Sequence, residues 1–138
     1  MKGIVADASV VVKYLFEEPG SVAAVRLLEG SEDVVAPELV FAECGNAVWK
    51  RARRGALTQD AVLDALSLLD ALSLQPLPLA DLTADALGIA LAFDHSIYDC
   101  YYVAAAIQTG HTLVTADRVL AGIAREVGLG EQVLLLGE

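Results

Sequence analysis

Short runs of aliphatic and β-branched residues alternate along this chain with longer stretches whose apolar residues recur at helical spacing. This alternation is typical of α/β proteins, in which helices cover a parallel sheet. We therefore predict a three-layer α/β/α fold with a central parallel sheet of about five strands. The expected strands cover residues 3–6, 34–36, 74–79, 111–115 and 132–136. Pro76 and Pro78 make the third of these strands short or place it at an edge.

Helical spacing fills the segments between these strands. The predicted helices cover residues 9–16, 21–28, 37–54, 81–93, 99–108 and 117–127. A further helix begins at Thr58, a residue type favoured at N-caps, and its apolar face is expected to contain Val62, Ala65, Leu66, Leu69 and Leu72. Because no repeat, linker or low-complexity segment interrupts the pattern, we predict one domain over residues 1–138.

The hydrophobic fraction of the chain, 56%, is high for a soluble protein. The longest stretch without Asp, Glu, Lys or Arg is residues 100–116, but its polar residues and Gly110 indicate helix, turn and strand rather than a membrane span. Asp7 interrupts the apolar N-terminus, so no signal peptide is expected. We interpret the surplus apolar surface as a dimer contact or a partner groove on a soluble, cytoplasmic domain.

Cysteine content and net charge narrow the function classes. Cys44 and Cys100 are too few for a disulfide framework or a zinc site, and we expect both to be buried as small apolar residues. A net charge of −10 argues against sequence-independent binding to phosphate backbones. A nucleic-acid function would therefore need a local cluster of basic residues.

Four acidic residues stand at strand ends or within apolar segments. Asp7 follows the first strand and Asp117 follows the fourth, so both are expected beyond the carboxyl ends of strands, where open parallel sheets bind ligands. Glu43 and Asp99 lie within the largely apolar segments 39–45 and 98–106. Each aspartate alone could simply cap a helix. An unpaired Glu43 on an apolar stretch would cost several kcal/mol unless something compensates it.

A hard divalent cation would explain the four acids together. Clustered carboxylates repel one another, and one or more would be protonated at neutral pH unless positive charge is supplied. A set of oxygen ligands without His or Cys favours Mg²⁺ or Mn²⁺ over zinc. Such a site activates a water molecule and stabilises charge on a phosphodiester.

The segments that carry these acids resemble the PIN-domain family, and within it the VapC toxins. The matching segments are VADAS (5–9), FAE (41–43), YDCYYVAAA (98–106) and LVTAD (113–117). They occur in the family's order and span nearly the whole chain. The resemblance implies the PIN fold, a homodimer, and Mg²⁺- or Mn²⁺-dependent endoribonuclease activity. It also implies the toxin role of a type II toxin–antitoxin module, in which a VapB-type antitoxin blocks that activity.

The resemblance also assigns roles to particular residues. It implies that the catalytic, metal-binding acids are Asp7, Glu43, Asp99 and Asp117. Ser9 and Thr115 would orient carboxylates or water. Asn46 lies one helical turn after Glu43 and is a candidate supporting residue, with ordinary packing equally open. Some relatives carry a further acid where Arg118 stands here, which leaves open whether one or two metal ions bind.

A basic segment follows Glu43 on the same predicted helix. It contains the candidate RNA-binding residues Lys50, Arg51, Arg53 and Arg54, four of the nine basic residues of the chain. A local basic edge can bind RNA phosphates in spite of a negative net charge. The alternative, a solvated helix end favoured by the helix dipole, is equally open.

Aromatic residues and histidines near the predicted site have ordinary interpretations. Stacking on bases is one use of Trp49, Tyr98, Tyr101 and Tyr102, but core or dimer contacts are more frequent. We interpret His95 and His111 as loop and strand-start residues, because a bound metal would already supply the activated water.

Other protein classes also use aspartates at strand ends. A haloacid-dehalogenase-type phosphatase would need an aspartate where Ser9 stands, and a receiver domain would need paired acids in its first loop. Two alternatives to an endoribonuclease stay open: a non-catalytic PIN-like interaction module and a DNA-directed metal-dependent nuclease. The sequence does not name the RNA that would be cleaved.

Overall fold

A parallel sheet forms the centre of the computed structural model, which describes residues 1–137. Within these residues the sheet has five strands in the order β3-β2-β1-β4-β5, and every neighbouring pair is parallel. The strands are short: β1 (Gly3–Ala6), β2 (Asp33–Pro37), β3 (Leu74–Leu77), β4 (Thr112–Thr115) and β5 (Val133–Leu135). Glu138, the last residue of the predicted domain, lies outside the described residues.

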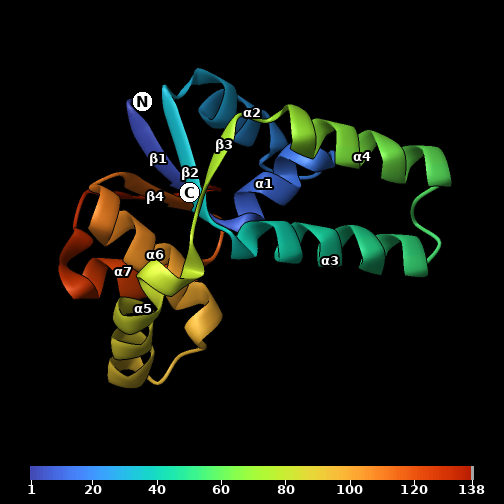
Figure 1. Ribbon diagram of the computed structural model, residues 1–138. Helices are drawn as coiled ribbons and strands as arrows, with labels where there is room; N and C mark the ends of the chain where they lie inside the picture. Colours follow the sequence, from blue (N-terminus) through green and yellow to red (C-terminus); the bar gives the residue numbers. More distant parts are fainter. Residues whose placement is uncertain (138) are drawn as a thin grey trace.

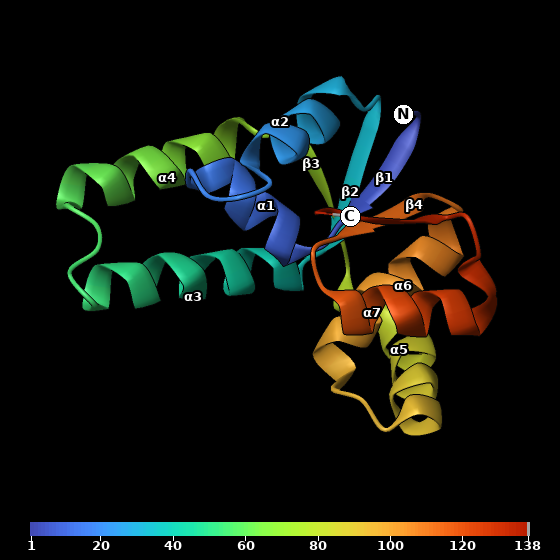
Figure 2. The ribbon, with the colours of Figure 1, turned by 180° about the vertical axis from the view of Figure 1, so that it is seen from behind.

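Helices cover both faces of the sheet. They are α1 (Ala8–Leu15), α2 (Ser21–Gly30), α3 (Leu39–Arg53), α4 (Gln59–Ala71), α5 (Leu79–Phe93), α6 (Ile97–Thr109) and α7 (Arg118–Ala124). Helices α1–α4 lie on one side of the sheet and α5–α7 on the other (Figures 1 and 2). The predicted three-layer α/β/α fold is therefore confirmed.

The strand order creates a crevice beside the central strand. From β1 the chain builds outward through β2 to β3, and it later returns to the other side of β1 to add β4 and β5. The connections thus reverse direction between β1 and β4. Open α/β sheets bind their ligands at such a reversal, outside the carboxyl ends of the two strands.

The core lies around the central strands and α6. Ile4, Val5, Leu113 and Val114 are fully buried because helices cover both faces of β1 and β4. In α6 the small residues 104–106 are also fully buried. Small side chains let this helix approach the sheet closely, which brings the acidic start of α6 near the ends of the strands.

Two details of the predicted elements differ from the structure by more than a shift of one or two residues at an element's end. Leu66 is predicted on the buried face of α4, but it is 46% exposed, and its neighbours Leu63 and Leu68 are exposed to similar degrees. The reason is that α3 and α4 form an arm that projects from the sheet, so α4 has few partners to cover it (Figure 1). The last helix ends at Ala124 and continues as a π-helical turn, Arg125–Leu129.

Other sequence expectations hold in the described part of the chain. Strand β3, with Pro76, is an edge strand, and Cys44 and Cys100 are buried free thiols. None of the helices within residues 1–137 combines the length and the apolar character that crossing a lipid bilayer requires.

A side-chain bridge fixes the amino-terminal ends of the three central strands. His111, just before β4, places its ring over Gly3 of β1 and bonds to Asp33 of β2, with Nε2 and Oδ2 2.7 Å apart. A Cβ on Gly3 would lie 2.5 Å from two atoms of this ring. The bridge therefore requires glycine at position 3.

We predict that Gly3→Ala destabilises the fold by about 1–3 kcal/mol, because the added methyl group must displace the His111 ring. The control is Gly88→Ala on α5, where an added Cβ meets nothing within 4 Å. That variant should gain up to about 1 kcal/mol from reduced unfolded-state entropy. The free energy of unfolding of both variants, measured in urea, checks this prediction. Equal stability of Gly3→Ala and the parent would contradict the claim that the His111 bridge requires glycine at position 3.

Candidate functional site

Asp7 lies at the carboxyl end of β1, in the crevice where the strand order reverses. Its side chain is buried, with 6% of its surface exposed. The carboxylate atom Oδ2 accepts hydrogen bonds from Ser9 Oγ at 2.5 Å and from Thr115 Oγ1 at 2.8 Å. Burial of a charged group is costly unless such donors compensate it, so these hydroxyls are a condition for an acid at this position.

The two hydroxyls also connect Asp7 to the end of β4. Ser9 Oγ accepts from the backbone N–H of Ala116 at 3.0 Å, and Thr115 Oγ1 accepts from the N–H of Asp117 at 3.0 Å. Each hydroxyl donates to Asp7 and accepts from the chain that follows β4. The structure thus places two of the three predicted supporting residues, Ser9 and Thr115, against Asp7, and Thr115 also holds the backbone of Asp117.

Glu43 reaches the crevice from the second turn of α3. Its Oε1 accepts a hydrogen bond of 2.5 Å from the hydroxyl of Tyr102, a fully buried residue of α6. This bond joins helices from opposite faces of the sheet. It explains how a carboxylate is tolerated on the apolar segment 39–45.

Asp99 and Asp117 hold the remaining two positions. Asp99 is the third residue of α6, whose N-cap is Ser96, so the alternative that Asp99 caps this helix is wrong. Its Oδ2 lies 2.7 Å from His95 Nε2. Asp117 is the N-cap of α7, and its Oδ1 accepts from the N–H groups of Val119 and Leu120. The capping role of Asp117 does not exclude cation binding, because capping uses only Oδ1 and leaves Oδ2 available.

All four acids share one pattern of hydrogen bonds. In each carboxylate the donors reach a single oxygen: Asp7 Oδ2, Glu43 Oε1, Asp99 Oδ2 and Asp117 Oδ1. Within residues 1–137, no protein hydrogen bond reaches the second oxygen of any of them. A carboxylate held in this way is oriented by one oxygen and keeps the lone pairs of the other for a cation.

The electrostatics of the site show uncompensated negative charge. Burial raises the pKa of Asp7 above its ordinary value, the bonds from Ser9 and Thr115 lower it, and the charges of Asp99 and Asp117 raise it. Burial likewise raises the pKa of Glu43, the bond from Tyr102 lowers it, and Asp7 and Asp99 raise it. Asp7 is therefore close enough to each of the other three acids for their charges to repel, and Glu43 is close enough to Asp99.

The chemistry of these side chains fits a hard divalent cation. Carboxylate oxygens are the preferred ligands of Mg²⁺ and Mn²⁺, and a cation would offset both the burial and the repulsion. Within residues 1–137, no three His, Cys, Asp or Glu side chains are close enough to share an ion as they stand. Shared coordination would therefore need side-chain rotation of Glu43, Asp99 or Asp117 toward Asp7.

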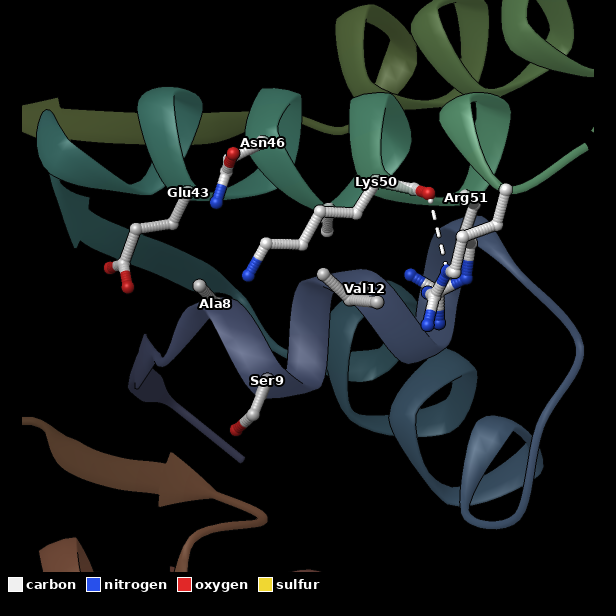
Figure 3. Close-up of a pocket in the computed structure, with 9 residues that line it drawn as sticks. Ala8, Ser9, Val12, Glu43, Asn46, Lys50 and Arg51 are labelled. Atoms are coloured by element: carbon white, nitrogen blue, oxygen red, sulfur yellow. Dashed lines mark hydrogen bonds between the residues drawn. The ribbon is translucent and has the colours of Figure 1, made fainter. Parts of the chain in front are cut away.

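A basic cleft of about 310 Å³ extends from Glu43 between α1 and α3. Ser9, Asn46, Lys50 and Arg54 line it together with Arg51. In Figure 3 the side chains of Glu43, Asn46 and Lys50 extend from the same side of α3 toward α1. The cleft therefore joins a carboxylate of the acid cluster to positive charge.

The four basic residues of α3 and its end are not equivalent. Arg51 forms a 2.8 Å ion pair with Glu18 and stacks on the ring of Phe16, so its charge is already paired. Arg53 does not line the cleft and stacks on Trp49. Lys50 and Arg54 are both exposed and line the cleft, so these two of the four candidate RNA-binding residues present their charge to it.

Two residues take part in the site although the sequence alone gives them other interpretations. Tyr102 is a core residue, but its hydroxyl bonds Glu43, and its position three residues after Asp99 on α6 is the signal that could have revealed it. His95, interpreted from the sequence as a loop residue, contacts Asp99. Burial raises the pKa of the Cys44 thiol, next to Glu43, to about 12, which disfavours the thiolate form that acts as a nucleophile.

Fold and site together define an α/β protein with an acidic centre at the reversal point of a parallel sheet. The family model of the PIN domain matches residues 4–126. The chain belongs to the PIN-domain family.

Three known proteins are similar to this chain over most of their length. Ribonuclease VapC3 of Pyrobaculum aerophilum is 33% identical over 123 residues, which cover 86% of this chain and 92% of that protein. The crystal structure of PAE2754 from the same organism superposes with a TM-score of 0.69 at 24% identity, over 95% of this chain and 89% of the other. VapBC-5 of Mycobacterium tuberculosis, described as a member of the VapBC toxin–antitoxin family, gives a TM-score of 0.58 at 17% identity, with coverage of 99% and 98%. These two structures support the fold.

We predict that Asp7 makes the metal-free protein less stable as pH rises. A carboxyl pKa raised by folding contributes stability below the unfolded value, 3.8, and this is lost as pH rises through the raised value. In EDTA, Asp7→Asn should therefore melt above the parent at neutral pH, and the gap should narrow toward acidic pH. Mg²⁺ at about a hundred times its Kd should stabilise the parent by roughly 2.7 kcal/mol and the variant by less.

Thermal melts in EDTA and in Mg²⁺, across a pH series, check this prediction. The hydrogen-bonded amide of Asn keeps the size of the Asp7 side chain, so packing is matched between the two proteins. A variant that melts below the parent in EDTA at neutral pH would show that burial of the charge is not the dominant cost.

Proposed function

We propose that this chain is an Mg²⁺- or Mn²⁺-dependent endoribonuclease that acts as the toxin of a type II toxin–antitoxin module. The observation that carries the proposal is a set of four carboxylates, each held through one oxygen, around the crevice at the carboxyl ends of β1 and β4. The similarity to Ribonuclease VapC3 supports RNA as the substrate. The fold shared with VapBC-5 supports a VapB-type antitoxin as partner. The homodimer and the cytoplasmic location remain predictions.

The residues that would hold the cation are Asp7, Glu43, Asp99 and Asp117. When bound, the cation supplies positive charge to the scissile phosphodiester and to the attacking water. Asp7 is the fixed member, because Ser9 and Thr115 hold it at the buried end of the crevice. Tyr102 restrains Glu43, and the N-terminus of α7 restrains Asp117. In hydrolysis the water oxygen bonds to phosphorus as the bond from phosphorus to the leaving ribose oxygen breaks, and the proton that the water releases is balanced by one that the leaving oxygen takes up from solvent.

The basic cleft would bind the RNA backbone beside the cation. Lys50 and Arg54 lie on the cleft wall that begins at Glu43, so a phosphate next to the scissile one would meet them. Arg118 stands at the start of α7, where some relatives carry an acid. This substitution favours one cation, because a second ion would lose a carboxylate ligand and gain a positive neighbour.

We predict that purified protein cleaves RNA with Mg²⁺ or Mn²⁺ and that EDTA abolishes the cleavage. Asp7→Asn should lower the rate by about 10²–10³-fold, as expected when the cation that stabilises charge in the transition state is lost or misplaced. The charge-matched control is Asp64→Asn on the exposed surface of α4, which should cleave as the parent does. Gel analysis of mixed RNA and single-stranded DNA, with each ion, measures both activities.

Each result distinguishes the open alternatives. Equal cleavage of RNA and DNA would favour a metal-dependent nuclease without sugar selectivity. Absence of cleavage combined with absence of Mn²⁺ binding would favour the non-catalytic interaction module.

We predict that Lys50→Gln weakens RNA binding without changing the chemical step. The variant should raise KM, leave kcat close to that of the parent, and reduce the slope of log affinity against log salt by about 0.7–1, the effect of one lost phosphate contact. Arg53→Gln is the matched control, because Arg53 stacks on Trp49 outside the cleft. Equal effects of the two variants would show that RNA senses the overall charge of α3 and not this cleft.

A further inference from the structure

We infer that His95 is a positioning residue that holds Asp99 for cation binding, an inference that rests on the proposed function. His95 Nε2 lies 2.7 Å from Asp99 Oδ2. A carboxylate accepts hydrogen bonds and does not donate them, so Nε2 carries the proton and donates it. Both side chains are partly buried, with 22% and 30% of their surfaces exposed.

The backbone fixes His95 in front of Asp99. His95 lies in the turn between α5 and α6, and its N–H donates to the carbonyl of Ala90 at 3.1 Å. Asp94, just before it, is the C-cap of α5 and has a φ of 48°, the one positive φ at a non-glycine residue within residues 1–137. A conformation that side chains rarely adopt persists where its surroundings determine it. The turn is therefore a defined structure that directs His95 toward the start of α6.

The contact gives Asp99 what the other three acids already have. Asp7 is held by two hydroxyls, Glu43 by Tyr102, and Asp117 by backbone N–H groups. Asp99 is close enough to Asp7 and Glu43 to raise the pKa of both, so repulsion acts on its side chain as well. A donor on Oδ2 keeps Asp99 in one orientation and leaves Oδ1 for a cation. Loss of a partner that orients a metal ligand typically lowers metal affinity by about 10- to 100-fold.

The competing role is purely structural. His95 and Asp99 are one helical turn apart, and a pair at this spacing stabilises the start of a helix. That role would affect melting temperature and leave cation affinity unchanged. The positioning role and the structural role can be separated by substituting His95 with residues that place a hydrogen-bond donor at different distances from Asp99.

The test compares His95→Ala, His95→Gln and His95→Asn by calorimetric Mn²⁺ titration, RNA cleavage kinetics and thermal melting. The amide nitrogen of Gln reaches the position of the imidazole Nε2, whereas that of Asn corresponds to Nδ1. We expect Ala and Asn to weaken Mn²⁺ binding by about 10- to 100-fold and to lower kcat with little change in KM for RNA. Gln should recover most of the affinity.

His111→Gln is the matched control, because His111 forms the other His–Asp pair, 2.7 Å from Asp33 at the opposite end of the sheet. It should leave Mn²⁺ affinity unchanged even where it lowers the melting temperature. Parent-like Mn²⁺ affinity in His95→Ala, or no difference between Gln and Asn, would overturn the positioning role and leave the proposed nuclease intact. A parent protein that binds no Mn²⁺ would overturn both.

Discussion

The buried carboxylate of Asp7 is the constraint on which the site depends. An acid with 6% exposure at the end of a central strand is tolerated because Ser9 and Thr115 donate to it. The same hydroxyls accept from the backbone after β4, so the compensation of one charge also fixes the ends of two adjacent strands. The compensation is incomplete, since the pKa of Asp7 is still raised. A cation would relieve the unfavourable energy that remains.

Side-chain hydrogen bonds join central strands at both ends of the sheet. At the amino-terminal ends, His111 bridges across Gly3 to Asp33 and joins β4, β1 and β2. At the carboxyl ends, the hydrogen bonds that the Ser9 and Thr115 hydroxyls donate to Asp7 join β1 to β4. Helices α3 and α6 then bring Glu43 and Asp99 from opposite faces, and the Tyr102–Glu43 bond connects them. Side chains from four elements thus lie around one crevice, and rotation of Glu43, Asp99 or Asp117 is what shared coordination of a cation would still require.

The parts that can be predicted from the sequence are those that depend on local pattern. Asp7 and Asp117 can be located because each directly follows a recognisable strand, and parallel strands bring their carboxyl ends together. The roles of Glu43 and Asp99 come from the family resemblance and are not tested by the fold. The contacts of His95 and Tyr102 depend on how α5, α6 and α3 approach one another, which periodicity does not report. The prediction for Leu66 is wrong for the same reason, because helical periodicity identifies an apolar face but not whether a partner covers it.

The strongly acidic chain and the proposed polyanionic substrate are compatible because charge is distributed unevenly. Glu18 pairs with Arg51 and so offsets part of the positive charge in the cleft, and Lys50 lines the same cleft as Glu43 of the acid cluster. Without a cation, the four carboxylates would repel an RNA phosphate from the crevice as they repel one another. On the proposed function, the cation therefore acts before any chemistry, since it converts a repulsive crevice into one that accepts a phosphodiester. Substrate binding and catalysis would then both require the bound cation. The net charge of −10 would disfavour the binding of RNA that does not reach the cation.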